Sequence, residues 1–172
     1  MTEEVYPVEL IAPDIEAYRK GNIGIEFVTS FDSGKPGPHV MINAVTHGNE
    51  ICGAIALDYL FKANVRPAQG KLTLGFINHL AYSNFDPKNP GPSRFVDEDF
   101  NRVWVEERLE GLEVTAELRR ARELRPVFDS VDLLLDIHSM GTYSKPLMIC
   151  NGLNKERNFT KKVNFPAYIM CG

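Results

Sequence analysis

The sequence has no run of lysines or arginines and no long apolar stretch. Its 19 basic residues are outnumbered by 23 acidic ones, which gives a formal net charge of -4 at pH 7. Such a chain has no basic block to attract the phosphates of a nucleic acid or an anionic lipid surface. No window reaches the roughly 18 apolar residues of a membrane span, and the acidic N-terminus MTEEVYPVEL lacks the apolar core of a signal peptide. We therefore expect no nucleic-acid and no membrane partner.

Cysteine is also scarce. Cys52, Cys150 and Cys171 are odd in number, widely spaced and set among apolar residues. This pattern fits reduced thiols better than a disulfide framework, which usually shows an even number of closely spaced cysteines. The cysteines predict a cytoplasmic protein.

The chain has 172 residues, of which 44% are hydrophobic, so it is long enough to bury the core of one domain. We expect residues 1–172 to form a single domain. Apolar or alternating stretches between turn residues predict strands, and helical spacing of apolar residues predicts helices. The predicted strands are 24–31, 39–45, 71–78 and 131–137, and the predicted helices are 50–63 and a solvent-facing 106–128. This alternation predicts an α/β fold with a mixed, mainly parallel sheet and helices on both faces.

Two histidines each follow a predicted buried strand, His47 after residues 39–45 and His138 after 131–137. Glu50 begins the helix that follows His47. The carboxyl ends of parallel strands meet at one edge of a sheet, so these three side chains should lie close together. Two imidazoles and a carboxylate, with a fourth position left to water, form the ligand set of catalytic zinc. The pattern predicts one Zn²⁺ per chain and hydrolytic chemistry, although a His/His/Glu set can also accept other first-row metals. Gly48 would allow a tight turn between the ligands.

Each of these residues also has a plainer interpretation. Glu50 could simply complement the dipole of the helix that it begins, and a lone His138 is more often a polar cap on a strand than a ligand. We assign no partner to His39 or His79 and interpret both as structural or solvated. The joint pattern favours a metal more strongly than any of its parts.

A second polar cluster, RFVDEDFNR at residues 94–102, follows the Pro/Gly-rich stretch 85–93, which predicts a functional loop. The amide of Asn101 and the guanidinium of Arg102 together could bind a carboxylate, and Arg94 could stabilise charge that develops on a carbonyl oxygen. Both roles suit an anionic substrate. The alternative is a surface loop whose acidic residues offset its arginines.

At this point the sequence resembles a family, the succinylglutamate desuccinylase and aspartoacylase branch of the zinc carboxypeptidase-like hydrolases. The residues that carry the resemblance are THGNE at 46–50, Arg94 seven residues ahead of the NR pair at 101–102, and DIHS at 136–139. It implies zinc held by His47, Glu50 and His138, oxyanion stabilisation by Arg94, and binding of the substrate α-carboxylate by Asn101 and Arg102. It also implies hydrolysis of an N-acyl amino acid, a small anionic substrate. Asp136, on the strand that leads to His138, is a candidate partner for a ligand histidine.

The resemblance also predicts that this chain is truncated at its C-terminal side. Family members are much longer, and their general-base glutamate lies well downstream of the third zinc ligand. The only carboxylate after His138 is Glu156, in the polar segment NGLNKERN, and we do not assign it that role. Residues 167–172 (AYIMCG) predict the start of a further strand.

Three hypotheses for the function follow. The first is a zinc-dependent hydrolase that cleaves the amide bond of an N-acyl amino acid. The second is a metallocarboxypeptidase, which would use the same zinc and arginine set in an open cleft. The third is a non-catalytic zinc-binding domain, oligomeric through an open sheet edge, which the missing general base favours.

Overall fold

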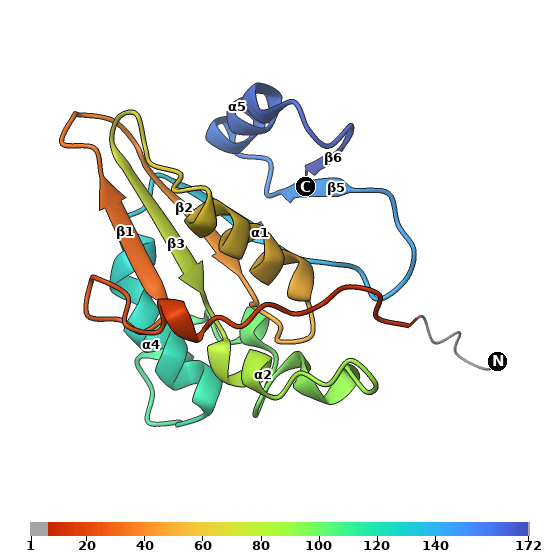
Figure 1. Cartoon of the computed structure of the whole chain (residues 1–172). Coiled ribbons are helices and arrows are strands. Elements are labelled where there is room, and N and C mark those ends of the chain that lie inside the picture. Colours follow the sequence, from red (N-terminus) through yellow and green to blue (C-terminus); the bar gives the residue numbers. More distant parts are fainter. Residues whose placement is uncertain (1–6, 172) are drawn as a thin grey trace. The chain divides into compact units, whose positions relative to one another are not determined.

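The computed structural model describes residues 7–171, which divide into two units between Ser139 and Met140 (Figure 1). The first unit contains a four-stranded sheet with α-helices and short 3-10 helices (η) around it. Its elements are η1 (Glu16–Tyr18), β1 (Val28–Asp32), β2 (His39–Ala44), α1 (Ile51–Lys62), β3 (Lys71–Phe76), α2 (His79–Ser83), η2 (Gly91–Arg94), η3 (Phe100–Arg102), α3 (Glu106–Leu109), α4 (Ala116–Asp129) and β4 (Leu133–Ile137). Among the described residues, no helix is long and apolar enough to cross a membrane.

The strand order of the four-stranded sheet is β1-β3-β2-β4. β2 runs parallel to both β3 and β4, and β1 runs antiparallel to β3. This confirms the predicted α/β fold with a mixed, mainly parallel sheet. The register pairs Ala44, the last residue of β2, with Phe76 on one side and Ile137 on the other. The three parallel strands therefore end level, and the segments that follow them leave the sheet at one edge.

Helices cover both faces of this sheet, α1 on one face and α4 on the other (Figure 1). Alternate residues of a strand point to opposite faces, and β2 follows this rule. Ala44 belongs to the hydrophobic core under α1, which includes Leu57 of that helix. Met41 belongs to the core under α4, which includes Leu118. Burial of apolar side chains on both faces fixes the sheet and holds its carboxyl edge in place.

The predicted helix 106–128 is in fact two helices. α3 ends at Leu109, and α4 begins after Thr115, whose Oγ1 accepts the backbone N–H of Leu118 at 3.1 Å. A threonine in this position caps a new helix, which is the local reason for the break. In α4 the leucines Leu118 and Leu124 are fully buried against the sheet, while Arg119 and Glu123 are exposed to solvent.

The first strand also differs from its predicted bounds, since it begins at Val28 instead of residue 24. Gly24 and Phe27 both have positive φ angles, +80° and 59°, and the backbone N–H of Phe27 donates to the carbonyl of Arg19 at 2.9 Å. These residues form a turn, so the alternating pattern there reflects burial of a few side chains and not an extended strand.

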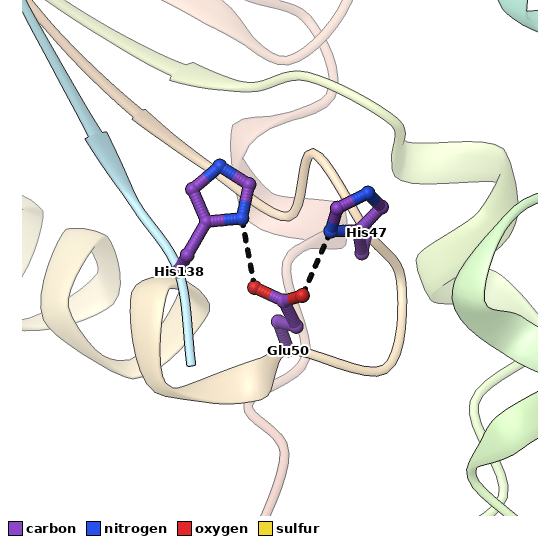
Figure 2. Close-up of side chains that lie close together, drawn as sticks. All are labelled: His47, Glu50 and His138. Atoms are coloured by element: carbon purple, nitrogen blue, oxygen red, sulfur yellow. Dashed lines mark hydrogen bonds and ion pairs between the residues drawn. The ribbon is translucent and has the colours of Figure 1, made fainter. Parts of the chain in front are cut away.

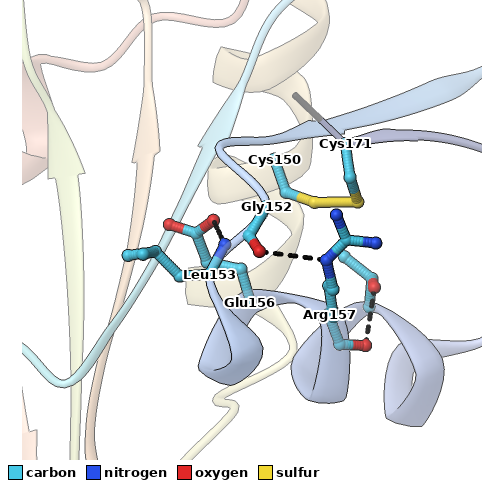
Figure 3. The surroundings of a disulfide bond; sticks show 7 residues. Cys150, Gly152, Leu153, Glu156, Arg157 and Cys171 are labelled. Carbon is cyan, nitrogen blue, oxygen red and sulfur yellow. Dashed lines mark hydrogen bonds between the residues drawn. A yellow bond between two sulfur atoms is a disulfide. The ribbon is translucent and has the colours of Figure 1, made fainter.

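The second unit consists of β5 (Leu147–Cys150), α5 (Asn154–Val163) and β6 (Tyr168–Cys171), with the two strands parallel. Cys150 and Cys171 are register partners at the strand ends and form a disulfide bond (Figure 3). The prediction of reduced thiols was therefore wrong for this pair, because parallel pairing of two short strands brings together cysteines that are distant in sequence. Cys52 is a free thiol. The thiol-based support for a cytoplasmic location no longer applies to Cys150 and Cys171.

Candidate metal centre

The side chains of His47, Glu50 and His138 meet at the carboxyl edge of the four-stranded sheet (Figure 2). His47 lies in the loop between β2 and α1, Glu50 is the residue before α1, and His138 directly follows β4. The Glu50 carboxylate lies between the two rings: its Oε1 is 2.7 Å from Nδ1 of His47, and its Oε2 is 2.9 Å from Nδ1 of His138. One ligand atom from each residue can be chosen so that all three lie within 4.8 Å of one another. The structure thus brings together the three residues that the sequence placed at this edge.

The three side chains differ in burial. The side chain of His47 is 2% exposed and that of Glu50 is 8% exposed, whereas that of His138 is 35% exposed. Two positions are therefore fixed inside the protein and the third faces outward. The cluster is therefore buried at His47 and Glu50 and reachable by solvent at His138.

The outer nitrogen of each histidine faces an aspartate. Nε2 of His138 is 2.9 Å from Asp136 Oδ2, and Nε2 of His47 is 3.1 Å from Asp99 Oδ1. Asp136 is held in turn by the hydroxyl of Thr46, which donates to its carboxylate at 2.9 Å. The structure therefore pairs Asp136 with His138, as the sequence suggested.

Asp99 is the site residue that sequence reasoning missed. It lies in the cluster 94–102, where its charge looked like a partner for the neighbouring arginines, and its contact with His47 spans 52 positions. The only feature of the sequence that could have indicated Asp99 is its position two residues before Asn101. The backbone N–H of Asn101 donates to Asp99 Oδ1 at 2.9 Å.

Hydrogen bonds decide the charge states in this cluster. Burial by itself would raise the pKa of Glu50, but hydrogen bonds from His138, His47 and the backbone N–H of Ser139 outweigh it and hold that pKa well below its usual range. Hydrogen bonds to Asp136 and Glu50 raise the pKa of His138 to about 10 against the opposing effect of burial. Glu50 is therefore a carboxylate, and without a metal the centre keeps a proton on His138.

Arg94 lies against the same cluster. Its Nη1 donates to Glu50 Oε1 at 3.3 Å and its Nη2 to Asp99 Oδ2 at 3.4 Å, and Nη2 is also 3.1 Å from His47 Nε2. Its side chain is 41% exposed, so the guanidinium can contact both the cluster and a ligand from solvent.

The other two predicted substrate-binding residues are at η3. Asn101 is exposed, and its Nδ2 is 3.4 Å from His47 Nε2, which is at the limit of a hydrogen bond. Arg102 is exposed at the end of η3, and within residues 7–171 its guanidinium makes no hydrogen bond. The structure thus brings Arg94 and Asn101 to the cluster, whereas Arg102 is exposed and makes no hydrogen bond to it.

The loop that carries His47 is packed tightly against the segment that carries Arg94. The backbone N–H of Gly48 donates to the carbonyl oxygen of Arg94 at 3.1 Å. A Cβ at position 48 would collide with backbone atoms of Ala81 and Ser93, whereas the φ of Gly48 is not positive. Glycine is therefore needed for close approach, and not for the turn conformation that the sequence suggested.

His39 and His79 lie outside the cluster. His39 begins β2, at the opposite end of the strand, and its ring nitrogens face the carbonyl of Ser130 and the hydroxyl of Thr73. His79 stacks on Phe27 with a centroid distance of 4.5 Å. Both are structural.

Several solved structures share the fold of this chain. An aspartoacylase family protein from Mesorhizobium loti is 24% identical with a TM-score of 0.59, and 86% of this chain covers 46% of that one. A succinylglutamate desuccinylase from a Silicibacter species is 20% identical with a TM-score of 0.64, with coverages of 84% and 44%. Murine aminoacylase 3 is 21% identical with a TM-score of 0.58, with coverages of 80% and 47%. The chain therefore spans less than half the length of these structures.

A search among curated proteins gave no significant match. A sequence profile did: residues 36–169 match the succinylglutamate desuccinylase/aspartoacylase catalytic domain. That range includes the loop of His47 and Glu50, the segment 94–102 and the end of β4. Because the match extends over most of the chain and the solved structures share its fold, this protein belongs to the succinylglutamate desuccinylase/aspartoacylase catalytic-domain family.

Proposed function

We propose that this chain provides the metal-binding and anion-binding part of a zinc-dependent deacylase, which hydrolyses the amide bond of an N-acyl amino acid. The observation that carries the proposal is the convergence of two imidazoles on one buried carboxylate at the carboxyl edge of the sheet. One Zn²⁺ per chain would be held by His47, Glu50 and His138. Membership in a family whose description names a desuccinylase and an acylase supports this reaction class.

The donor set fits zinc. Nitrogen and carboxylate oxygen are ligands that zinc accepts, and three protein ligands leave a position for water or substrate. If each histidine donates its Nε2–H to an aspartate, Asp99 for His47 and Asp136 for His138, the lone pair of Nδ1 points toward Glu50. Carboxylates bonded to the outer nitrogen fix ring orientation and tautomer in the same way at known metal centres.

A zinc ion at this position would polarise the substrate carbonyl and lower the pKa of a bound water toward about 7. The residues of the chain itself have the other tasks. Arg94, partly exposed beside Glu50 and His47, would stabilise negative charge on the amide oxygen as it develops. Asn101 and Arg102 would bind the carboxylate of the amino acid product, and the exposed fork of Arg102 is free to form a bidentate pair.

We assign no residue of this chain as general base. Glu156, the only carboxylate after His138, lies in α5 of the second unit, where it accepts the backbone N–H of Leu153 at 3.2 Å (Figure 3). Without a positioned base, the rate would fall by about 10² to 10⁴. We therefore expect firm metal binding by the chain and slow turnover.

The two alternative functions differ in what the protein would do after binding metal. A metallocarboxypeptidase would cleave peptides and leave N-acyl amino acids intact. A non-catalytic domain would bind zinc with no turnover of either substrate, even with a large excess of enzyme. Assays with N-succinylglutamate and with a set of short peptides separate these outcomes from the deacylase.

The first experiment is elemental analysis of the purified protein and of two variants. We expect about one zinc per chain in the wild type, a strong loss in His138→Ala, and no change in His39→Gln, because His39 lies at the other end of β2. A protein that stays metal-free after zinc is added back would contradict the proposal. Equal zinc content in wild type and His138→Ala would show that the metal binds elsewhere.

A further inference from the structure

Glu117 is a fully buried carboxylate outside the metal centre. It is the second residue of α4 and is 0% exposed. No lysine or arginine among the described residues pairs with it, although an ionised carboxylate is costly to bury alone. Such a residue needs several hydrogen-bond donors, and their identity indicates what the carboxylate holds.

The donors to Glu117 come mainly from the segment 94–102. Its Oε1 accepts the backbone N–H of Val96 at 2.7 Å, and its Oε2 accepts those of Asp97 at 3.0 Å and Glu98 at 3.3 Å. The fourth donor is Nδ2 of Asn78, at the carboxyl end of β3, at 3.1 Å. One carboxylate thus fixes three consecutive amides of an otherwise irregular segment.

The segment holds α4 in return. Asp97 Oδ2 accepts the backbone N–H of Ala116 at 2.7 Å, and Glu98 Oε1 accepts the hydroxyl of Thr115 at 2.7 Å. Because an anion at a helix N-terminus is favourable, the first turn of α4 is a suitable place for Glu117. The reciprocal bonds couple the position of the segment to that of the helix, which packs under the sheet.

The three anchored amides lie between the functional side chains of the segment. Arg94 is two residues before Val96, and Asp99 directly follows Glu98. Arg94 and Asp99 both contact His47. A shift of the anchored backbone would move both side chains away from the metal centre together.

From these contacts we infer that Glu117 is a positioning residue, which holds the segment 94–102 in the conformation that presents Arg94, Asp99 and Asn101 to the metal centre. This inference rests on the proposed function for its ligand, an N-acyl amino acid. Its structural part, the order of the segment, does not depend on that function.

The test compares Glu117→Gln with the control Glu107→Gln, which changes an exposed carboxylate of α3. In Glu117→Gln an amide NH₂ faces backbone donors, so amide hydrogen exchange in residues 95–101 should accelerate by about tenfold or more. Fluorescence of Trp104, the only tryptophan, should report the same loosening, since its ring contacts Phe100 of η3. Zinc content should stay at the wild-type level because no ligand residue has moved. Affinity for N-succinylglutamate should fall by about tenfold or more.

The outcomes separate the two parts of the inference. Unchanged exchange in residues 95–101 would overturn it, as would faster exchange with unchanged ligand affinity. If the wild type binds zinc but no N-acyl amino acid, the proposed function fails, and the exchange data still decide whether Glu117 orders the segment. If Glu117→Gln does not fold, the same criteria apply to Glu117→Asp, which keeps the carboxylate but shortens the side chain. Faster hydrogen exchange in residues 95–101 of this variant, by a smaller factor than expected for Gln, would support the inference. Unchanged exchange in these residues would contradict the inference.

Discussion

At the residue scale, the candidate metal centre consists of side chains of two kinds. His47, Glu50 and His138 were predictable because each follows or begins a regular element whose end can be read from the sequence. Asp99 was not predictable as a partner of His47, because nothing in the local sequence indicates a contact over 52 positions. Periodicity predicts where strands end, whereas contacts between loops depend on the folded backbone. That the first three residues hold zinc stays a prediction.

Gly48 gives a residue-scale prediction for stability. A Cβ there would overlap the backbone of Ala81 and Ser93, which cannot move as a flexible side chain would. We expect Gly48→Ala to lower the free energy of unfolding by about 1 to 3 kcal/mol, the usual cost of overpacking. The measurement is urea unfolding of zinc-free protein, so that metal binding does not contribute.

The matched control for Gly48→Ala is Gly91→Ala. Gly91 is in the same region of the fold, in η2, but an added Cβ there meets no atom within 4 Å. Its free energy of unfolding should change by less than about 0.5 kcal/mol. Equal changes in the free energy of unfolding for the two substitutions would mean that the loop of His47 can shift to accommodate the added Cβ.

At the element scale, the helical character of α4 was predictable from the sequence, but the burial of its individual charged residues was not. Charged residues at many positions suggested a helix in solvent, but one of these charges, Arg120, is only 5% exposed. Its guanidinium donates to the carbonyl oxygens of Ile77 and Glu26, both at 2.8 Å. Composition alone could not distinguish this arginine from its exposed neighbour Arg119, because both have the same side chain and differ only in which face of the helix they occupy.

Arg120 therefore predicts how firmly α4 is attached to the sheet. Arg120→Leu leaves buried carbonyl groups without donors, so we expect a loss of about 2 to 4 kcal/mol in the free energy of unfolding. Arg119→Leu, which removes an exposed charge from the same helix, should change it by less than about 0.5 kcal/mol. Thermal or urea unfolding of both variants measures these losses. If apolar packing alone attached α4 to the sheet, the two variants would have the same free energy of unfolding.

At the scale of the whole molecule, the fold class was predictable and the division of the chain was not. Strands alternating with helices indicated the parallel sheet and its two covered faces, because burial patterns repeat along the sequence. The boundary at Ser139 and the pairing of β5 with β6 left no such pattern, since these strands have four residues each. The expectation of a single domain over residues 1–172 stays a prediction.

The second unit has very little core of its own. Of its described residues, only Cys150 and Thr160 are buried. A unit of this size usually needs a covalent constraint, and the disulfide closes a loop with a sequence separation of 21. The bond is worth about 3 kcal/mol by loop closure.

We therefore expect the double variant Cys150→Ser/Cys171→Ser to lose protection in residues 147–171 and to keep it in the four-stranded sheet. Hydrogen exchange followed by mass spectrometry measures both regions in one experiment. Cys52→Ser is the control, since Cys52 is a free thiol and its removal should leave residues 147–171 unchanged. Three reactive thiols in the untreated wild-type protein would contradict the disulfide itself.

The side chains around His47 and His138 also have a consequence for the order of binding. Glu50, Asp99 and Asp136 are within hydrogen-bond distance of the two rings, and among residues 7–171 Arg94 is the only arginine or lysine in contact with this group, through His47, Glu50 and Asp99. With a proton on His138 and a neutral His47, three negative charges against two positive leave the metal-free group with a formal charge of -1. A divalent cation that displaces the proton of His138 would bring the charge of the group to zero. On the proposed function, we expect the metal-free centre to repel an anionic substrate, so that the cation binds before the substrate does.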